Sequence, residues 1–106
     1  MNLPVQSSIQ NVEIKNNLTT PTQLKIIQML DRIESLLIEK NRKYGDSALT
    51  PTRVFSQAST IEQLKVRIDD KLSRIRSNQY DEDEDVIIDL IGYLVLYMIS
   101  LENNDL

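Results

Sequence analysis

The sequence predicts an all-α fold, a three-helix bundle, from three observations. Only 2 Gly and 3 Pro interrupt 106 residues that are rich in Leu, Ile, Lys, Glu and Gln, which favours long helices over sandwiches or barrels. Two segments carry apolar residues at intervals of three and four, the spacing of one helix face, and a third segment is almost continuously apolar. The length suits one domain, so we expect an irregular N-terminal arm over residues 1–20 and a single helical domain over 21–106.

The composition excludes several kinds of chemistry. The chain has no Cys and no His, so thiol nucleophiles, disulfides, His-based catalysis and zinc sites with these ligands are impossible. Any metal would be a hard cation on carboxylates, such as Mg²⁺. The net charge of −4 argues against direct nucleic-acid binding. No basic segment leads into an apolar run at the start, so we expect no signal peptide and a cytoplasmic protein.

The first helix is expected to run from Pro21 to about Tyr44. Thr20 suits the N-cap and Pro21 the first helical position, while Gly45 suits the position just past the last turn. One apolar stripe follows the helix and consists of Ile26, Leu30, Ile33 and Leu37. For residues 1–20 two interpretations are open, a mobile arm or an arm that orders against a partner subunit.

The second helix is expected to open at Ser59 or Thr60, because Thr60 followed by Gln63 fits a capping box. Its buried stripe consists of Ile61, Leu64, Ile68, Leu72 and Ile75. The polar connection before it, residues 45–60, is long for so small a chain. We expect Val54 and Phe55 to pack into the core and to order this connection.

The third helix follows an acidic run, residues 81–85, whose charges oppose the positive end of the helix dipole. From Val86 to Ile99 the polar or small exceptions are Asp89, Gly92, Tyr93 and Tyr97. The segment is shorter than the roughly 20 apolar residues of a membrane span, so we expect no membrane association. A helix that is apolar all round is buried all round, and two other helices cannot surround it. We therefore expect a homo-oligomer.

Asp89 is the most informative position, because an unpaired carboxylate inside an apolar helix is costly. Asp85 lies one turn before it and Gly92 about one turn after it, so the three form a narrow polar stripe. Two interpretations are open. The acids share a hard cation, or Asp89 accepts hydrogen bonds from a cation of the second helix. The candidates for that cation are Arg67, Lys71 and Arg74.

Two other charged clusters have a structural and a functional interpretation. The second helix carries Arg67, Asp69, Asp70, Lys71 and Arg74, which form either a solvated face or a site where cations hold phosphate and acids hold metal. The central connection is flanked by Lys40, Arg42, Lys43, Tyr44 and Arg53. These residues form either an ordinary helix C-terminus or a phosphate-facing rim with Tyr44 stacked on a base.

Several ordered blocks between Lys40 and Glu102 resemble the phage and bacterial family called nucleotide modification associated domain 1. They are the segments 40–47, 54–56, 67–75 and 89–94, together with Pro51 and the Glu84-Asp85 pair. The resemblance implies a phage or prophage setting and an association with base modification, hence the host cytoplasm. The chain is more distantly similar to MazG-like all-α nucleoside triphosphate pyrophosphatases, whose paired acidic motifs hold Mg²⁺. It departs from their pattern at Val86 and Ser73, where those enzymes carry acids.

The sequence therefore predicts a domain that binds a nucleotide or cyclic-nucleotide-type phosphate ligand. Its role is to handle modified nucleotides or to sequester a host nucleotide immune signal, which is an anti-defence function. The expected ligand residues are Lys43, Tyr44, Arg53, Arg67, Lys71 and Arg74. One alternative is a Mg²⁺-dependent pyrophosphatase whose metal ligands are Asp69, Asp70, Asp85 and Asp89. Another is a structural interaction module without a ligand. No cofactor other than Mg²⁺ is expected.

Overall fold

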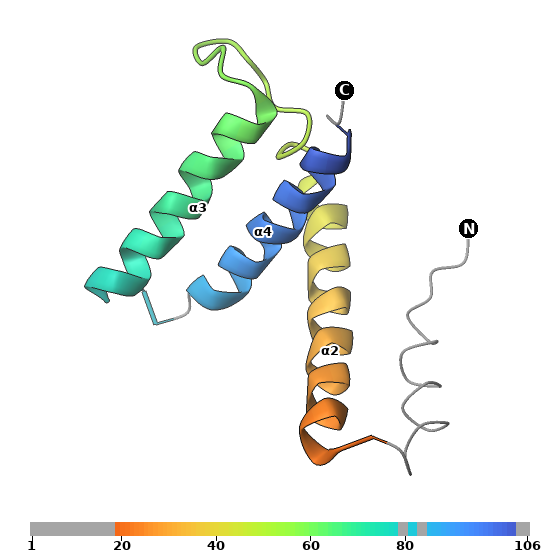
Figure 1. Ribbon diagram of the computed structural model, residues 1–106. Helices are drawn as coiled ribbons and strands as arrows, with labels where there is room; N and C mark the ends of the chain where they lie inside the picture. The colour runs from red at the N-terminus through yellow and green to blue at the C-terminus, as the bar shows by residue number, and fades with distance from the viewer. Residues whose placement is uncertain (1–18, 79–80, 83–84, 104–106) are drawn as a thin grey trace. The chain divides into compact units, whose positions relative to one another are not determined.

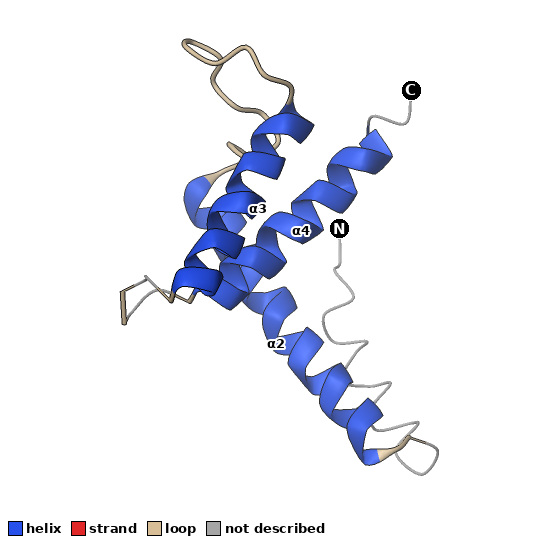
Figure 2. Ribbon diagram, turned by 60° about the vertical axis from the view of Figure 1, so that its left-hand side comes forward, coloured by secondary structure: helices blue, strands red, loops and turns tan. Residues whose placement is uncertain are grey.

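The computed structural model describes residues 19–78, 81–82 and 85–103. Its regular elements in these ranges are three α-helices, α2 (Pro21–Tyr44), α3 (Thr60–Ser77) and α4 (Val86–Asn103), and no strand occurs there (Figures 1 and 2). The all-α prediction with three helices is confirmed. The arm expected over residues 1–20 falls outside the described ranges except for its last two residues. The chain divides into two compact units, Met1–Gly45 and Asp46–Leu106, and each is described by itself.

The first unit contains α2, which begins and ends where its sequence predicts. The Gln23 amide donates to the Thr20 hydroxyl at 3.1 Å, and the Thr20 amide donates to the Gln23 side chain at 3.1 Å, so a capping box closes the first turn. Pro21 follows the cap, where its missing N–H costs nothing. Gly45 ends the helix with a φ of 71°, a conformation that side chains disfavour. Of the expected apolar stripe, Ile33 is buried, whereas Ile26 and Leu30 are exposed.

The second unit is a helical hairpin in which α3 and α4 lie side by side and run in opposite directions (Figures 1 and 2). Asn78 ends α3 in the left-handed conformation, and its amide donates to the Arg74 carbonyl. Leu64 of α3 and Val86 and Ile88 of α4 are buried.

The cap of α3 differs in detail from the prediction. The N-cap is Ser59, whose hydroxyl accepts from the Glu62 amide at 3.1 Å. Gln63 does not close a capping box with Thr60, because its side-chain amide donates to the Ala58 carbonyl at 2.8 Å. Thr60 is instead free to bind the preceding loop, where its hydroxyl accepts from Arg53 at 2.8 Å.

The loop between Asp46 and Ser59 is held by polar contacts, and the expectation that Val54 and Phe55 pack into the core is wrong. Phe55 is 98% exposed and Val54 is also exposed. The Arg53 guanidinium donates to the Ala58 carbonyl at 3.1 Å, and the Gln57 side chain donates to the Arg53 carbonyl at 3.0 Å. Hydrogen bonds between the loop and its own backbone thus replace apolar burial as the source of its shape.

The apolar helix α4 is not covered all round within the described chain. Val86, Ile88 and Ser100 are buried, whereas Ile87, Leu94, Val95, Met98, Ile99 and Leu101 are exposed. By length and composition alone α4 could cross a membrane, a property that core helices of other proteins share. Both the homo-oligomer and the absence of membrane association stay predictions.

Candidate functional site

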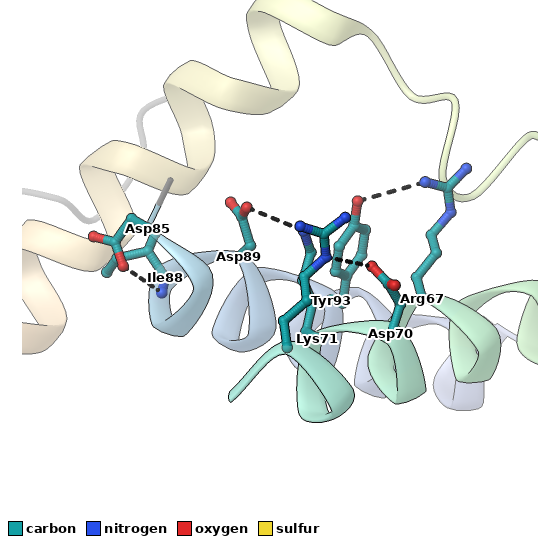
Figure 3. Close-up of polar contacts among 8 residues, drawn as sticks. Arg67, Asp70, Lys71, Asp85, Ile88, Asp89 and Tyr93 are labelled. Carbon is teal, nitrogen blue, oxygen red and sulfur yellow. Dashed lines mark hydrogen bonds and ion pairs between the residues drawn. The ribbon is translucent and has the colours of Figure 1, made fainter. Parts of the chain in front are cut away.

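Charged side chains follow the contact between α3 and α4 and form a surface that we call the polar strip (Figure 3). Its members come from two helices and one cap: Arg67, Asp70, Lys71 and Arg74 lie on α3, Asp89 and Tyr93 lie on α4, and Asp85 directly precedes α4. The α3 residues share one helix face because they are spaced by three, four and seven positions. The sequence predicted six ligand residues and four metal ligands, and six of these ten residues belong to the strip.

Asp89 forms a largely buried ion pair with Lys71. Their Nζ and Oδ2 atoms are 3.5 Å apart, and the two side chains are only 14% and 24% exposed. Lys71 is one of the three cations that the sequence offered as a partner. The contact agrees with the interpretation of Asp89 as half of an internal ion pair. Because both groups are largely withdrawn from water, losing either one would leave a poorly solvated charge behind.

Asp70 and Arg74 form a second ion pair within α3. The Arg74 Nε atom lies 3.2 Å from Asp70 Oδ2, one helical turn away, and the side chains are 40% and 55% exposed. A pair this open to solvent contributes little to stability. It nevertheless neutralises part of the positive charge that Arg74 could offer to a ligand.

Arg67 differs from these cations because neutral groups hold it. Its guanidinium carbon lies 5.7 Å from the centre of the Tyr93 ring, and its Nη1 atom is 3.5 Å from the Tyr93 hydroxyl. A guanidinium at this distance is attracted by the π face of the ring. No carboxylate in the described part of the chain pairs with Arg67. Tyr93 is a functional candidate that the sequence did not reveal, since its contact with Arg67 depends on how α3 and α4 pack together.

Asp85 caps α4. Its Oδ1 atom accepts from the Ile88 amide at 3.0 Å, and its carbonyl accepts from the Asp89 amide at 3.0 Å. Asp69, the remaining acid of the expected metal set, is exposed on α3. In the described ranges no three acids gather into a group that could hold a metal ion. Asp70 and Asp89 form ion pairs with cations and Asp85 caps a helix, and a Mg²⁺ site on these acids stays a prediction.

The other expected ligand residues lie outside the strip. Lys43 and Tyr44 end α2 in the first unit, where Lys43 Nζ is 5.3 Å from the centre of the neighbouring ring. Glu39 binds Arg42 beside them, and this hydrogen bond raises the pKa of Arg42. Arg53 belongs to the second unit and lines an open cavity of about 250 Å³ at the start of α3.

Two acids on α2 have an environment that the sequence did not predict. Asp31 and Glu34 each have one buried carboxylate oxygen, and neither oxygen finds a hydrogen-bond partner among the described residues. Their spacing of three positions is visible in the sequence and places them on one helix face. The spacing alone could not reveal the burial, which depends on what covers the helix.

Comparison of the chain with protein-family models, with curated proteins and with solved structures found no match. The resemblance to the nucleotide modification associated family and the more distant likeness to MazG-like enzymes therefore stay predictions from the sequence blocks.

Proposed function

We propose that the second unit binds a nucleotide or nucleotide-derived phosphate ligand at Arg67 and Tyr93 of the polar strip. In the phage setting that the family resemblance implies, the ligand is a modified nucleotide or a host nucleotide immune signal. Binding alone suffices for sequestration, so the role needs no metal cage.

The observation that carries this proposal is the charge of Arg67, which no described carboxylate neutralises. A guanidinium presents a planar fork that matches two phosphate oxygens, and it stays charged at every physiological pH. Tyr93 holds the guanidinium in place and offers an aromatic surface to a nucleobase, since base–aromatic stacking is tolerant of base identity. Lys71 and Arg74 contribute less, because Asp89 and Asp70 offset their charges.

Titration calorimetry with a panel of nucleoside mono-, di- and triphosphates and cyclic nucleotides tests the proposal. We expect saturable binding to the full chain, weakened about tenfold or more by Arg67→Gln, because a charge-assisted hydrogen bond is lost. Arg76→Gln is the matched control, since it removes the same charge from the exposed end of α3.

The outcomes separate the candidate functions. Equal affinity in wild type and Arg67→Gln would remove the strip as the ligand site, and no binding by any nucleotide would favour the interaction module. Chromatography of the same mixtures with added Mg²⁺ reports cleavage. Pyrophosphate release would establish the pyrophosphatase alternative instead.

A further inference from the structure

We propose that the cavity at the start of α3 is a second anion site, which binds a tetrahedral oxyanion of the phosphate class. The residues that line this loop cavity are Leu49, Arg53, Ser59, Thr60, Ser100 and Asn103. Thr60 precedes Arg67 by seven residues and Ser100 follows Tyr93 by seven, so about 10 Å of helix separates the cavity from the polar strip. The proposal does not depend on Arg67.

Arg53 supplies the positive charge of the loop cavity. Its Nε atom donates to the Ala58 carbonyl at 3.1 Å, and its Nη2 atom donates to the Thr60 hydroxyl at 2.8 Å. Both acceptors are neutral, and no described carboxylate forms an ion pair with Arg53. The guanidinium is therefore fixed in orientation while its charge and its Nη1 hydrogens remain available, which is the preorganised state that favours anion binding.

Ser100 gives the independent indication of a ligand. This residue is only 3% exposed, it lines the cavity, and its hydroxyl makes no hydrogen bond with any described residue. Two other helical serines donate to the carbonyl four residues back, Ser35 at 3.3 Å and Ser77 at 2.8 Å. The Ser100 hydroxyl instead opens onto the cavity with its hydrogen unused. An oxyanion in the cavity would supply the missing acceptor.

The first turn of α3 adds further donors. The amides of Glu62 and Gln63 are used by the side chain and the carbonyl of Ser59, which leaves the amides of Thr60 and Ile61 for a ligand. The Ser59 hydroxyl accepts from Glu62 and keeps its own hydrogen to donate. The cavity thus combines one cation with several neutral donors.

The charges around the cavity permit an anion. The start of α3 carries a partial positive charge, whereas the end of α4, with Glu102 in its last turn, is negative. Arg53 is the charge that favours an anion here. Glu62 is the acid in the first turn of α3. Lys65 binds it at 3.1 Å, and this hydrogen bond raises the pKa of Lys65 and offsets the acid.

Titration of the full chain with inorganic phosphate in a phosphate-free buffer tests the site. We expect one saturable site per chain, competed by sulfate and much less by acetate, whose planar group lacks the tetrahedral oxygens. Ser100→Ala should weaken phosphate binding about tenfold, because one hydrogen bond to a charged ligand is lost. Alanine is favourable in a helix, so this variant should fold. Arg53→Gln should abolish measurable binding.

Two matched variants complete the experiment. Ser77→Ala removes a hydroxyl from the same hairpin, and Arg76→Gln removes an exposed cation of α3, and neither should change the phosphate affinity. Arg67→Gln should also leave it unchanged, which separates this site from the polar strip. The proposal is overturned if phosphate shows no saturable binding, or if Ser100→Ala binds like wild type, or if Arg67→Gln alone abolishes binding. A nucleoside monophosphate that displaces phosphate from the wild type, and that itself no longer binds to Arg53→Gln, would identify the oxyanion as part of a larger ligand.

Discussion

The ion pair between Lys71 and Asp89 is less exposed than the pair between Arg74 and Asp70, the other ion pair described in the polar strip. Asp89→Asn keeps the shape of the side chain and leaves the Lys71 ammonium without its carboxylate. Breaking a fully buried pair costs about 3–5 kcal/mol, and the remaining exposure of 14% and 24% reduces our expectation to roughly 1–3 kcal/mol. In a unit of this size the melting temperature should fall by about 5–15 °C, measured by circular dichroism.

The matched control for this substitution is Asp70→Asn, which breaks the exposed pair with Arg74. It should cost only about 0.3–0.5 kcal/mol. Added Mg²⁺ should leave both variants and the wild type unchanged, because the partner of Asp89 is the Lys71 ammonium and not a metal ion. If Mg²⁺ stabilises the wild type but not Asp89→Asn, the metal interpretation of this acid is correct after all.

The sequence predicted that Asp89 needs a partner but could not name it. The requirement follows from one residue and its apolar neighbours, whereas the choice of Lys71 depends on the register between two helices, which no local pattern fixes. The same limit explains Tyr93 and Ser100. Each is unremarkable within its own helix and becomes a candidate only through Arg67 or through the loop cavity.

At the scale of the helix, Asp85 should act as the cap of α4 and not as a metal ligand. Its carboxylate accepts from the Ile88 amide, a contact that a serine hydroxyl can also make. Asp85→Ala should therefore lower the free energy of unfolding by about 1 kcal/mol. Asp85→Ser should lower it by only about 0.3 kcal/mol. Urea denaturation measures both values. Equal losses in the two variants would contradict the capping role.

The helices themselves were the most predictable elements. Their ends follow from local chemistry: Thr20 and Pro21 start α2, Gly45 stops it, and Ser59 starts α3. The connecting loop was predicted less well, since Phe55 was expected inside and lies outside. Apolar residues in a loop indicate burial only on average, and here the hydrogen bonds of Arg53 and Thr60 already determine the path of the chain.

At the scale of the whole molecule, the apolar surface of α4 exceeds what its hairpin partner covers. A row of large side chains remains exposed on this helix, among them Ile87, Leu94 and Met98. Contiguous apolar surface of this kind normally marks an interaction site. A second copy of the chain carries the same surface and can pair with it by twofold symmetry, so that each copy buries the face of the other.

We therefore expect sedimentation velocity at micromolar concentration to give at least twice the chain mass of 12.3 kDa. Met98→Glu should shift the protein toward monomer, because it places a charge in the apolar interface. Val66→Glu is the matched control, since Val66 of α3 and Met98 of α4 are both 66% exposed and only Met98 lies on the apolar helix. Wild type that sediments as a monomer would exclude the oligomer. Flotation of that monomer with phospholipid vesicles, lost in Met98→Glu, would show that α4 is covered by lipid instead, which its length and composition allow.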